Sequence, residues 1–591
     1  MKFTKLSIEN FRNFESATIN IDNKNVIFGM NDIGKTNFLY ALRFLFDPEL
    51  RRNGFGPSDY NNHNVDKNIS ITITIDLSDF NQSEDTKKLV AAIHGAHTSP
   101  PLEEDLFYIQ LKSEFNKKEE YGNIVLFWGS DYENLVEIPS RGNVSAFDKA
   151  FKVFYVNPLV NLDRLFNKNK KLFFEQSEGQ SADQDIIDTI KGLTCNVNDE
   201  IGKLTTIKKF QEEITKEYKT LRRENVSVEL KSEMAIKGFF SDVIPYIKKD
   251  DDNDRYYPTS GDGRRKMLSY SIFNYLAKNK YEDKIIIFLI EEPEISLHRS
   301  MQISLSKKLF ENDTYNYFFL STHSPEMLYE MNNTRLIRVH SPEKINCCSY
   351  LYNVEEPYTS VKRKLNRSLA SALFAERVLL VEGPSELTLF EKVLSMVKPD
   401  YELEGGFILQ VGGIYFKHYT NALKELNIHY IVKTDNDLKR KKKKKGEYEL
   451  IGLNRCLSLI DETKLDNEFI DIPEGMPDKE EKIFIKEEVQ RKKEELYCKH
   501  SDIIETLKQN SIYLSRIDLE NDLYKVIEDK MKEVFGENPV KQLQDSKLFN
   551  MVDLVIELDK QECEDIYNDE NFYCLVELTN STKQEGEDNV I

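Results

Sequence analysis

The stretch from Gly29 to Thr36 has the residue types and the spacing of a loop that binds nucleotide phosphates. It reads Gly-Met-Asn-Asp-Ile-Gly-Lys-Thr and matches the pattern GxxxxGK followed by Ser or Thr in full. In such loops the glycines let backbone N–H groups turn toward the phosphates, the lysine reaches the β and γ phosphates, and the final hydroxyl binds Mg²⁺. The sequence therefore predicts an ATP site formed by Gly29, Asn31, Gly34, Lys35 and Thr36.

Two glutamates at the end of an apolar run are placed to complete this pocket. The run Ile285–Ile290 predicts a buried strand, and Glu291 and Glu292 follow where that strand emerges. Phosphoryl hydrolysis needs one group to hold Mg²⁺, directly or through water, and another to polarise the attacking water. We expect Glu291 to take the first role and Glu292 the second, against the alternative of a solvated acidic turn.

A second set of carboxylates indicates a different chemistry. One apolar strand runs into Glu382, with Glu386 a helical turn later, and a second apolar strand farther along leads to Asp435 and Asp437. The two-residue period of a strand puts Asp435 and Asp437 on one side. Clustered carboxylates repel one another, and Mg²⁺ or Mn²⁺ suits oxygen ligands, so these four acids are predicted to bind divalent cations. A pair of such ions stabilises the attacking and leaving oxygens of a phosphodiester, which indicates hydrolysis of DNA or RNA.

Apolar patterns predict the elements that position these residues. A strand over Val26–Phe28 precedes the phosphate loop and a helical pattern follows it, while the strand Val378–Val381 opens a new α/β unit. Between the two sites, the charged and helically periodic span 155–245 predicts an inserted arm, unless it belongs to the helical layer of the first unit. Charged, helix-prone sequence over 475–510 is expected to be an insertion in the second unit rather than core.

Length and composition favour several globular domains without a membrane anchor. The chain has 591 residues, of which 40% are hydrophobic and 31% charged, so it exceeds one ordinary core and is not a disordered chain. No apolar run approaches the ~20 residues of a membrane span, and seven cysteines without a CxxC pair suggest neither a disulfide framework nor a zinc site. We therefore expect no membrane association and a reducing cytoplasm.

Charge restricts where nucleic acid can bind. The net charge of −20 excludes a surface covered with phosphate-binding Lys and Arg, so any contact with DNA must be local. The basic run Lys439–Lys445 is one candidate, although such runs are more often solvated loops.

The motifs around the first site resemble those of ABC-type ATPase heads. Ser260 and Gly261 stand before the carboxylate strand where such heads carry a serine-glycine signature, and His323 follows the next apolar strand where they carry a histidine. The resemblance implies that the signature closes over the γ-phosphate of a neighbouring protomer and that His323 contacts the same phosphate, and hence at least a homodimer. The opening segment Ile8–Phe14 is similar to that of RecF and related heads that act on DNA. This chain departs from ABC proteins in carrying Glu291 where they usually have Asp.

The second acid set resembles the Toprim domain of topoisomerases, primases and OLD-family nucleases. A Glu-Gly pair followed by Asp-x-Asp, placed after an ABC head in one chain, resembles the OLD family and within it the nuclease subunits of Gabija antiphage systems. In that family further acids and a lysine complete the centre, and the resemblance places Asp518, Glu520 and Lys547 there. The choice among Asp518, Glu520 and Asp522 stays open, and by itself Lys547 would be a surface lysine. The resemblance also implies that bound ATP restrains cleavage and that a UvrD-like helicase is the partner in defence against phage.

These observations predict an α/β protein with two parts. Residues 1–345 are expected to form an ABC-type P-loop ATPase head with a helical dimerisation arm at about 155–245, and residues 346–591 a Toprim domain with a helical insertion and C-terminal helices. The predicted function is an ATP-binding endonuclease that uses Mg²⁺ or Mn²⁺ to nick or cut double-stranded DNA as a dimer or tetramer. The acids are expected to activate water, and Lys547 to stabilise phosphate charge.

Two other classes of protein share parts of this pattern. A non-cleaving, RecF-like ATPase that clamps DNA would keep the head but lack the acids, whereas Glu382, Glu386, Asp435 and Asp437 are all present. A topoisomerase or primase would need a catalytic tyrosine domain or a primer-synthesis domain, and no motif of either kind is visible. The endonuclease is therefore the preferred interpretation.

Overall fold

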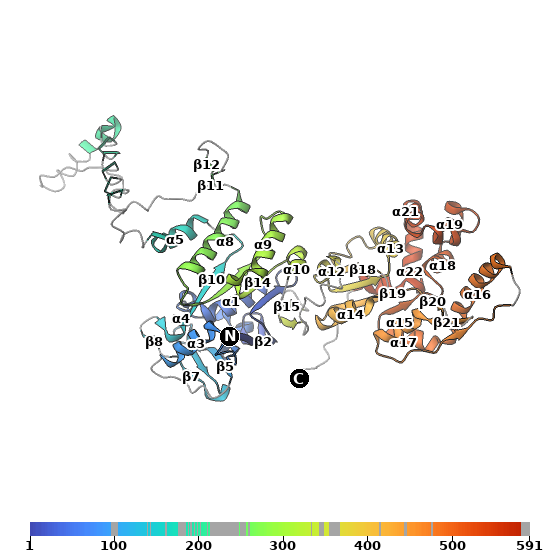
Figure 1. Ribbon diagram of the computed structural model, residues 1–591, viewed down its shortest axis with the longest axis horizontal. Coiled ribbons are helices and arrows are strands. Elements are labelled where there is room, and N and C mark those ends of the chain that lie inside the picture. The colour runs from blue at the N-terminus through green and yellow to red at the C-terminus, as the bar shows by residue number, and fades with distance from the viewer. Residues whose placement is uncertain are drawn as a thin grey trace.

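The computed structural model contains two α/β units that follow one another along the chain (Figure 1). It describes residues 1–95, 105–138, 140–141, 144–159, 162–174, 261–331, 334–341, 348–353, 367–412, 415–441, 446–473 and 477–580, with scattered residues between 185 and 257. Among the helices in these ranges, none has the length and apolar character needed to cross a membrane.

An antiparallel sheet forms one side of the first unit. On its strand β1, Leu6 and Ile8 are fully buried between more exposed polar neighbours, because successive side chains of a strand point to opposite faces. Phe3 is also fully buried, since an irregularity in the strand pairing between Phe3 and Lys5 shifts the alternation by one residue. The spatial order of the strands is β2 (Phe14–Asn20), β1 (Lys2–Phe11), β4 (Ile69–Asp76), β5 (Leu106–Asn116), β6 (Tyr121–Gly129) and β7 (Val136–Glu137).

A second, mainly parallel sheet carries the predicted nucleotide site. Its central strands are apolar without interruption, as in Ile285–Ile290, because both of their faces are covered. The strand β16, which lies beyond the expected boundary at 345, pairs antiparallel with β15 at the edge of this sheet. The spatial order is β10 (Phe151–Val156), β13 (Ile285–Glu291), β14 (Tyr317–Ser321), β3 (Lys24–Phe28), β15 (Arg335–His340) and β16 (Tyr350–Asn353).

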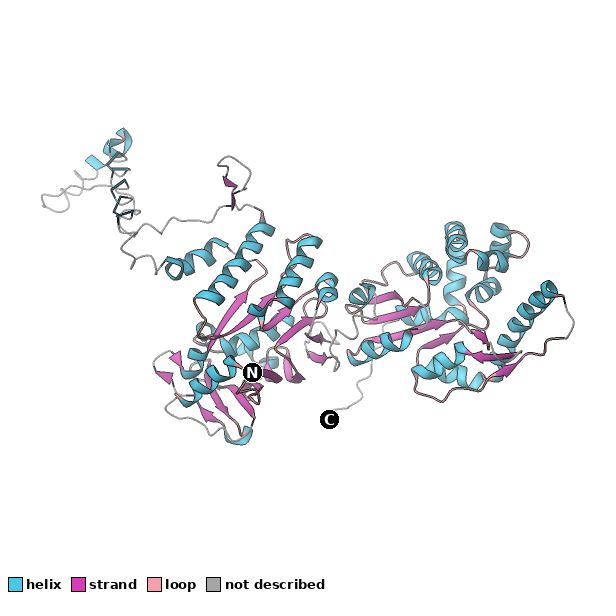
Figure 2. Cartoon of the chain, in the orientation of Figure 1, coloured by secondary structure: helices cyan, strands magenta, loops and turns pink. Residues whose placement is uncertain are grey.

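Helices fill the space between the sheets and cover the far face of the parallel one (Figure 2). The helix α1 (Lys35–Phe46) buries Phe38, Leu42 and Leu45 between the two sheets. The far face is covered by α8 (Asp262–Asn279), α9 (Arg299–Glu311) and α10 (Pro325–Glu330). The smaller elements are α2 (Pro48–Arg51), α3 (Glu84–His94), α4 (Ala146–Ala150), β8 (Ser140–Arg141), β9 (Val144–Ser145), β11 (Ile247–Lys248) and β12 (Tyr256–Tyr257).

The expected arm at 155–245 is described only in part. Residues 155 and 156 end β10 and belong to the parallel sheet. The helix α5 (Leu162–Phe174) packs beside α8, with Leu162 fully buried and Asp163 paired with Arg265 at 2.5 Å. This first part of the span therefore belongs to the helical layer of the head, and most of the remainder lies outside the described residues.

The second unit is built on a four-stranded, fully parallel sheet. Along β17, Leu379 and Val381 pack into one core and Val378 and Leu380 into the other, so both faces are buried. This burial explains the uninterrupted apolar run from which the strand was predicted. The spatial order is β18 (Gly406–Gln410), β17 (Arg377–Val381), β19 (His429–Thr434) and β23 (Ile512–Leu514).

Helices and a small antiparallel sheet surround this parallel sheet. The helices that pack on the strands from the first part of this unit are α12 (Arg367–Ala372), α13 (Pro384–Val397), α14 (Phe416–Glu425) and α15 (Ile451–Leu459). The small sheet consists of β20 (Leu438–Arg440), β21 (Glu447–Leu450) and β22 (Glu468–Phe469). The C-terminal helices are α18 (Leu519–Val526), α19 (Glu528–Phe535), α20 (Pro539–Asp545), α21 (Lys547–Glu557), α22 (Lys560–Asn568) and α23 (Tyr573–Thr579).

The charged span 475–510 forms two helices with different surroundings. The helix α16 (Asp478–Lys499) is mostly polar and partly exposed, in agreement with the predicted insertion. The helix α17 (Ser501–Gln509) instead buries Ile504 and Leu507 against the sheet, so for this part the expectation is wrong. Two apolar residues three positions apart share one helix face and reach the core, although their neighbours are charged.

Candidate functional site

The predicted phosphate loop lies between β3 and α1. Gly34 has a φ of 103°, and a Cβ there would come within 1.8 Å of Asn13 Nδ2, so only glycine fits. A Cβ at Gly29, where φ is 144°, would come within 2.3 Å of a carbonyl oxygen of β15. The Lys35 ammonium is buried and donates to Gly29 O at 3.1 Å. Burial lowers the pKa of Lys35 to about 8, although nearby carboxylates such as Glu292 oppose the shift.

Glu291 meets the loop at the carboxyl end of β13. Its Oε1 accepts a hydrogen bond from Thr36 Oγ1, and its Oε2 accepts one from the Tyr155 hydroxyl of β10. The carboxylate and the hydroxyl predicted to bind Mg²⁺ are thus brought together, while Asn31 is exposed in the loop. Tyr155 is a member of this site that the sequence does not single out.

Glu292 and His323 form a second pair beside Lys35. The distance between His323 Nε2 and Glu292 Oε1 is 3.0 Å. Burial and the charge of Lys35 lower the pKa of His323 to about 4, so its imidazole is neutral at pH 7 and the contact is a hydrogen bond. Glu292 has a φ of 41°, a left-handed conformation that is costly for a residue with a side chain. Such strain is typical of functional sites.

The signature residue Gly261 stands at the start of α8, and the same helix contacts the turn after Glu292, where the Lys266 ammonium donates to Glu292 O at 3.1 Å. Gly261 precedes α8 as its N-cap, and a Cβ there would meet no atom within 4 Å. Among the described residues, no atom lies within reach of such a Cβ. Ser260 lies outside the described residues.

The nuclease candidates meet where parallel strands of the second unit end. Glu382 follows β17, Asp435 follows β19, and Glu386 and Glu520 lie in the first turns of α13 and α18. Lys547 begins α21, with its Nζ 2.9 Å from Glu520 Oε1 and 4.0 Å from Asp435 Oδ2. Five side chains from four separate segments are thus assembled around one point.

Burial and mutual repulsion set the electrostatics of this acid cluster, by which we mean Glu382, Glu386, Asp435 and Glu520. Burial, and then the charges of Glu386, Glu382 and Glu520, raise the pKa of Asp435 well above its ordinary value. Burial and the neighbouring Glu382 likewise raise the pKa of Glu386, and burial raises that of Glu520. Lys547 opposes these shifts. A site of this kind favours the entry of positive charge.

The other predicted acids have different surroundings. Asp437 faces Arg455 and Lys493, which approach its carboxylate to 3.4 and 3.6 Å. Asp518 caps α18 by accepting from the Asn521 backbone N–H at 2.9 Å, and its other oxygen accepts from Gln544. Asp522 forms a buried ion pair with Lys433 at 3.3 Å. Of the three acids left open in α18 and its cap, Glu520 is the one that reaches Lys547.

The acid cluster fits a divalent cation in charge and in donor type. Glu520 Oε2 is buried without a hydrogen-bond partner in the described part of the chain, as an oxygen that awaits a ligand would be. Carboxylate oxygens are the donors that Mg²⁺ and Mn²⁺ prefer. Across the described ranges, however, no three His, Cys, Asp or Glu side chains are already close enough to hold a metal ion. Binding would therefore draw these carboxylates together.

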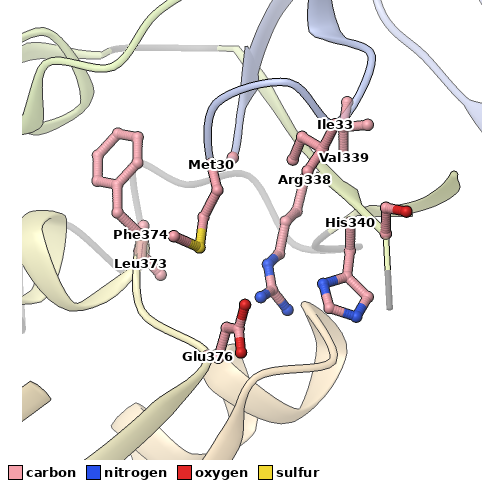
Figure 3. Close-up of a pocket in the computed structure, with 10 residues that line it drawn as sticks. Met30, Ile33, Arg338, Val339, His340, Leu373, Phe374 and Glu376 are labelled. Atoms are coloured by element: carbon pink, nitrogen blue, oxygen red, sulfur yellow. The ribbon is translucent and has the colours of Figure 1, made fainter. Parts of the chain in front are cut away.

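A small pocket separates the phosphate loop from the second unit (Figure 3). Met30 of the loop faces Phe374, which lies between α12 and β17, and Arg338 of β15 extends toward Glu376. The Phe374 ring lies 6.5 Å from the His323 ring at an interplanar angle of 28° and also contacts Phe28 at the end of β3. Phe374, just before β17, thus contacts residues beside the predicted nucleotide site.

Arg338 ties the two units together. It is 3% exposed, and its guanidinium donates to Leu426 O at 2.8 Å, Asn427 O at 2.6 Å and Ala375 O at 3.4 Å. All three acceptors belong to the second unit. The sequence did not mark this residue, because an arginine in a strand gives no local signal of a distant partner.

Comparison with known proteins agrees with this architecture. A family profile described as AAA ATPase domain matches residues 1–328, and one described as Overcoming lysogenization defect protein-like, TOPRIM domain matches residues 373–437. Endonuclease GajA from Bacillus cereus (strain VD045) is 62% identical over 584 residues, which cover 99% of this chain and 100% of that protein. The chain belongs to the GajA endonuclease family.

More distant proteins are also similar to this GajA family member. The Old nuclease of Escherichia phage P2 is 22% identical over 422 residues, which cover 65% of this chain and 68% of that protein. The C-terminal region of the Burkholderia pseudomallei OLD protein is 13% identical, with 35% of this chain and 100% of that chain covered and a TM-score of 0.23. The predicted α/β fold with an ATPase head and a Toprim domain is confirmed by the two profiles and the sheets.

Proposed function

We propose that this chain is a metal-dependent endonuclease that nicks or cuts double-stranded DNA. The observation that carries the proposal is the meeting of the acid cluster with Lys547 at the end of the Toprim strands. The similarity to a protein named endonuclease GajA, over essentially the whole length of both chains, supports it.

The residues of the second unit have distinct tasks in this proposal. Mg²⁺ or Mn²⁺ bound by the acid cluster, with Asp437 and Asp518 beside it, would activate water and offset the charge of the scissile phosphate. Burial raises the pKa of both Glu386 and Asp435, so a cation beside them favours their ionised forms. Lys547, held by Glu520 at 2.9 Å, presents an ammonium that stabilises phosphate oxygens.

We infer that the head binds ATP and Mg²⁺. Thr36 and Glu291, which share a hydrogen bond, would hold the ion, and Glu292 with the neutral His323 would face the γ-phosphate. The phosphates would lie against Gly29, Asn31, Gly34 and Lys35. Ser260 and Gly261 of a neighbouring protomer would close the pocket, so we propose a homo-oligomer, either a dimer or a tetramer.

Nucleotide in the head is proposed to regulate cleavage, with bound ATP as the restraining state. The contact of Phe374 with both His323 and Phe28 supports this idea, because Phe374 lies three residues before β17 and Glu382 directly follows that strand. A change at the γ-phosphate can therefore reach the strand that carries a nuclease acid. We further propose a role in defence against phage, with a UvrD-like helicase as partner. The proposed compartment is the cytoplasm, since the five described cysteines are all free, which fits a reducing environment.

The experiment that tests these proposals is cleavage of supercoiled plasmid with Mg²⁺ or Mn²⁺, with and without ATP. Glu382→Ala is expected to abolish cutting, while the matched Glu505→Ala, at an exposed position of α17, keeps it. Lys35→Ala is expected to cut equally with and without ATP. Equal cutting by the wild-type chain in both conditions would overturn the regulation alone. No cutting of any DNA substrate under any condition would instead favour the non-cleaving, RecF-like ATPase.

A further inference from the structure

The helix α15 is built to lie directly against the loop that carries Asp435 and Asp437. The Gly452 N–H donates to Asp437 O at 3.0 Å. A Cβ at Gly452 would come within 2.5 Å of Asp435 O and 2.6 Å of Asp437 N, distances that no side chain tolerates. Glycine at this position therefore lets the first turn of the helix touch the acid loop.

Arg455 follows Gly452 by three residues and therefore projects from the same side of α15. Its side chain is 8% exposed. One guanidinium nitrogen, Nη1, donates to both Glu382 Oε1 and Thr434 Oγ1. The other, Nη2, lies 3.4 Å from Asp437 Oδ2. The guanidinium thus spans the ends of β17 and β19, the two strands that deliver the predicted acids.

These contacts hold one carboxylate oxygen of Glu382, Oε1, and leave the other, Oε2, without a donor in the described part of the chain. Glu382 Oε1 accepts from Arg455, from the Thr434 hydroxyl and, at 3.4 Å, from the Asp435 N–H. No hydrogen bond to Glu382 Oε2 occurs among the described residues. With Oε1 held by three donors, Oε2 is the oxygen available to a cation in the acid cluster.

We propose that Arg455 is a positioning residue of the nuclease, which fixes Glu382 so that its free oxygen faces the cation. This inference rests on the metal-dependent cleavage proposed above. Ligands of a bound metal are commonly oriented by a second layer of hydrogen bonds, and loss of such a bond costs about 10- to 100-fold in metal affinity or activity. Arg455 also supplies permanent positive charge beside carboxylates that repel one another.

The guanidinium shape matters as much as its charge. Arginine offers two nitrogens in a rigid fork, whereas lysine offers one point charge. Arg455→Lys keeps the charge but replaces the planar fork, whose two nitrogens reach Glu382 and Asp437 separately, with a single ammonium nitrogen. Arg455→Met keeps most of the length and removes both the charge and the bonds. The two substitutions therefore separate positioning from simple neutralisation.

The test measures binding of Mn²⁺ to the full-length protein by electron paramagnetic resonance, without DNA. We expect the dissociation constant to rise about 10- to 100-fold in Arg455→Met and by an intermediate factor in Arg455→Lys. The matched control is Arg491→Met, because Arg491 is 76% exposed and pairs with Glu488 of its own helix. Plasmid cleavage at varied Mn²⁺ is expected to shift its half-saturating concentration in the same direction and order.

Other outcomes would overturn the proposal. Unchanged Mn²⁺ binding in Arg455→Met would mean that Arg455 does not position Glu382 for the cation. Tighter binding would mean that the guanidinium competes with the cation for the carboxylates. If Arg455→Met fails to fold in a thermal unfolding assay, unchanged binding in Arg455→Lys decides against positioning. A wild-type chain that binds Mn²⁺ but cuts no DNA would overturn the proposed nuclease activity. The effect of the Arg455 substitutions on Mn²⁺ binding would still test the positioning role. A wild-type chain that binds no Mn²⁺ would overturn both.

Discussion

Glu520 and Asp522 lie two positions apart in α18 but face different surroundings. Residues at this spacing point in different directions on a helix. Glu520 reaches Lys547 in the acid cluster, whereas Asp522 pairs with Lys433 in the interior, where the two side chains are 1% and 2% exposed. The first arrangement suits cation binding and the second suits folding, so substitutions at the two positions should have different consequences.

Glu520→Gln is expected to lower plasmid cleavage by roughly 100-fold, because it removes a proposed cation ligand and the partner of Lys547. The melting temperature should not fall, since the change also removes a buried negative charge from a repulsive cluster. Cleavage within a few fold of the wild-type rate would contradict the assignment of Glu520.

Asp522→Asn is expected to lower the free energy of unfolding by about 3–5 kcal/mol, because the Lys433 ammonium stays buried without its charge partner. Urea unfolding of the purified protein measures this loss. Asp529→Asn, at an exposed position of α19, serves as the control and should be neutral. A stable Asp522→Asn protein that has lost cleavage would place Asp522 in the nuclease centre instead.

At the residue scale, the sequence predicts those site residues that belong to a recognisable local pattern. Glu382 and Asp435 stand where apolar strands end, and the phosphate loop has a fixed spacing, so both candidate sites could be predicted. Arg455 and Tyr155 were missed because they approach their acids from separate segments whose own patterns are those of an ordinary helix and strand. The three acids around α18 could not be separated without knowing how that helix is rotated.

At the element scale, one carboxylate joins the C-terminal helix α23 to two strands. Glu577 accepts from Tyr513 at 2.6 Å and from Ser511, and its Oε1 lies 2.8 Å from His429 Nε2. Burial alone would raise the pKa of Glu577, but these hydrogen bonds outweigh it and lower the pKa below 4.5. The network therefore stabilises the folded state in its ionised form.

Glu577→Gln is expected to lower the free energy of unfolding by about 1–3 kcal/mol at pH 7. Because the folded-state pKa is depressed, the contribution of Glu577 is fully present above the ordinary value of 4.5 and is lost progressively as the pH falls below it through the lower folded-state pKa. The difference between the wild type and the variant in chemical unfolding should thus shrink at pH 4. A constant difference, or an equal loss in the exposed control Glu557→Gln, would argue against this linkage.

Elements with uninterrupted apolar runs were predictable, since β13, β17 and β19 are buried on both faces. The helix α17 was not, because charged neighbours conceal the pair Ile504 and Leu507 that anchors it. The start of the expected arm belongs to the head for a similar reason. Its charged residues face outward while Leu162 is fully buried.

At the scale of the whole molecule, Phe374 connects the nucleotide site to the Toprim sheet. Phe374→Ala removes the ring that contacts His323 and Phe28. We expect cleavage without ATP to persist and the inhibition by ATP to weaken by at least about 5-fold, the lower end of typical coupling between sites. The measurement is the ratio of plasmid cleavage rates without and with ATP. The control Phe80→Ala changes a phenylalanine of the head that is 43% exposed, and it should keep the wild-type ratio. A wild-type ratio in Phe374→Ala would contradict the proposal that Phe374 couples the nucleotide site to the Toprim sheet.

The order of the two units along the chain was predictable from the motifs, but their junction was not. Its contacts join residues far apart in sequence, such as Arg338 with Leu426 and Asn427, and neither partner carries a local signal. Contacts of this kind follow from the three-dimensional arrangement of both units together.

The acceptors of Arg338 are main-chain carbonyls rather than side chains. Every amino acid offers a carbonyl oxygen, so the Toprim half can change its residues at these positions without losing the bond. The junction therefore requires a particular residue, Arg338, on the side of the head, but no particular side chain at these three positions of the Toprim half. Chimeras that join this head to the Toprim half of a divergent family member should therefore retain the attachment, as long as the head keeps its arginine.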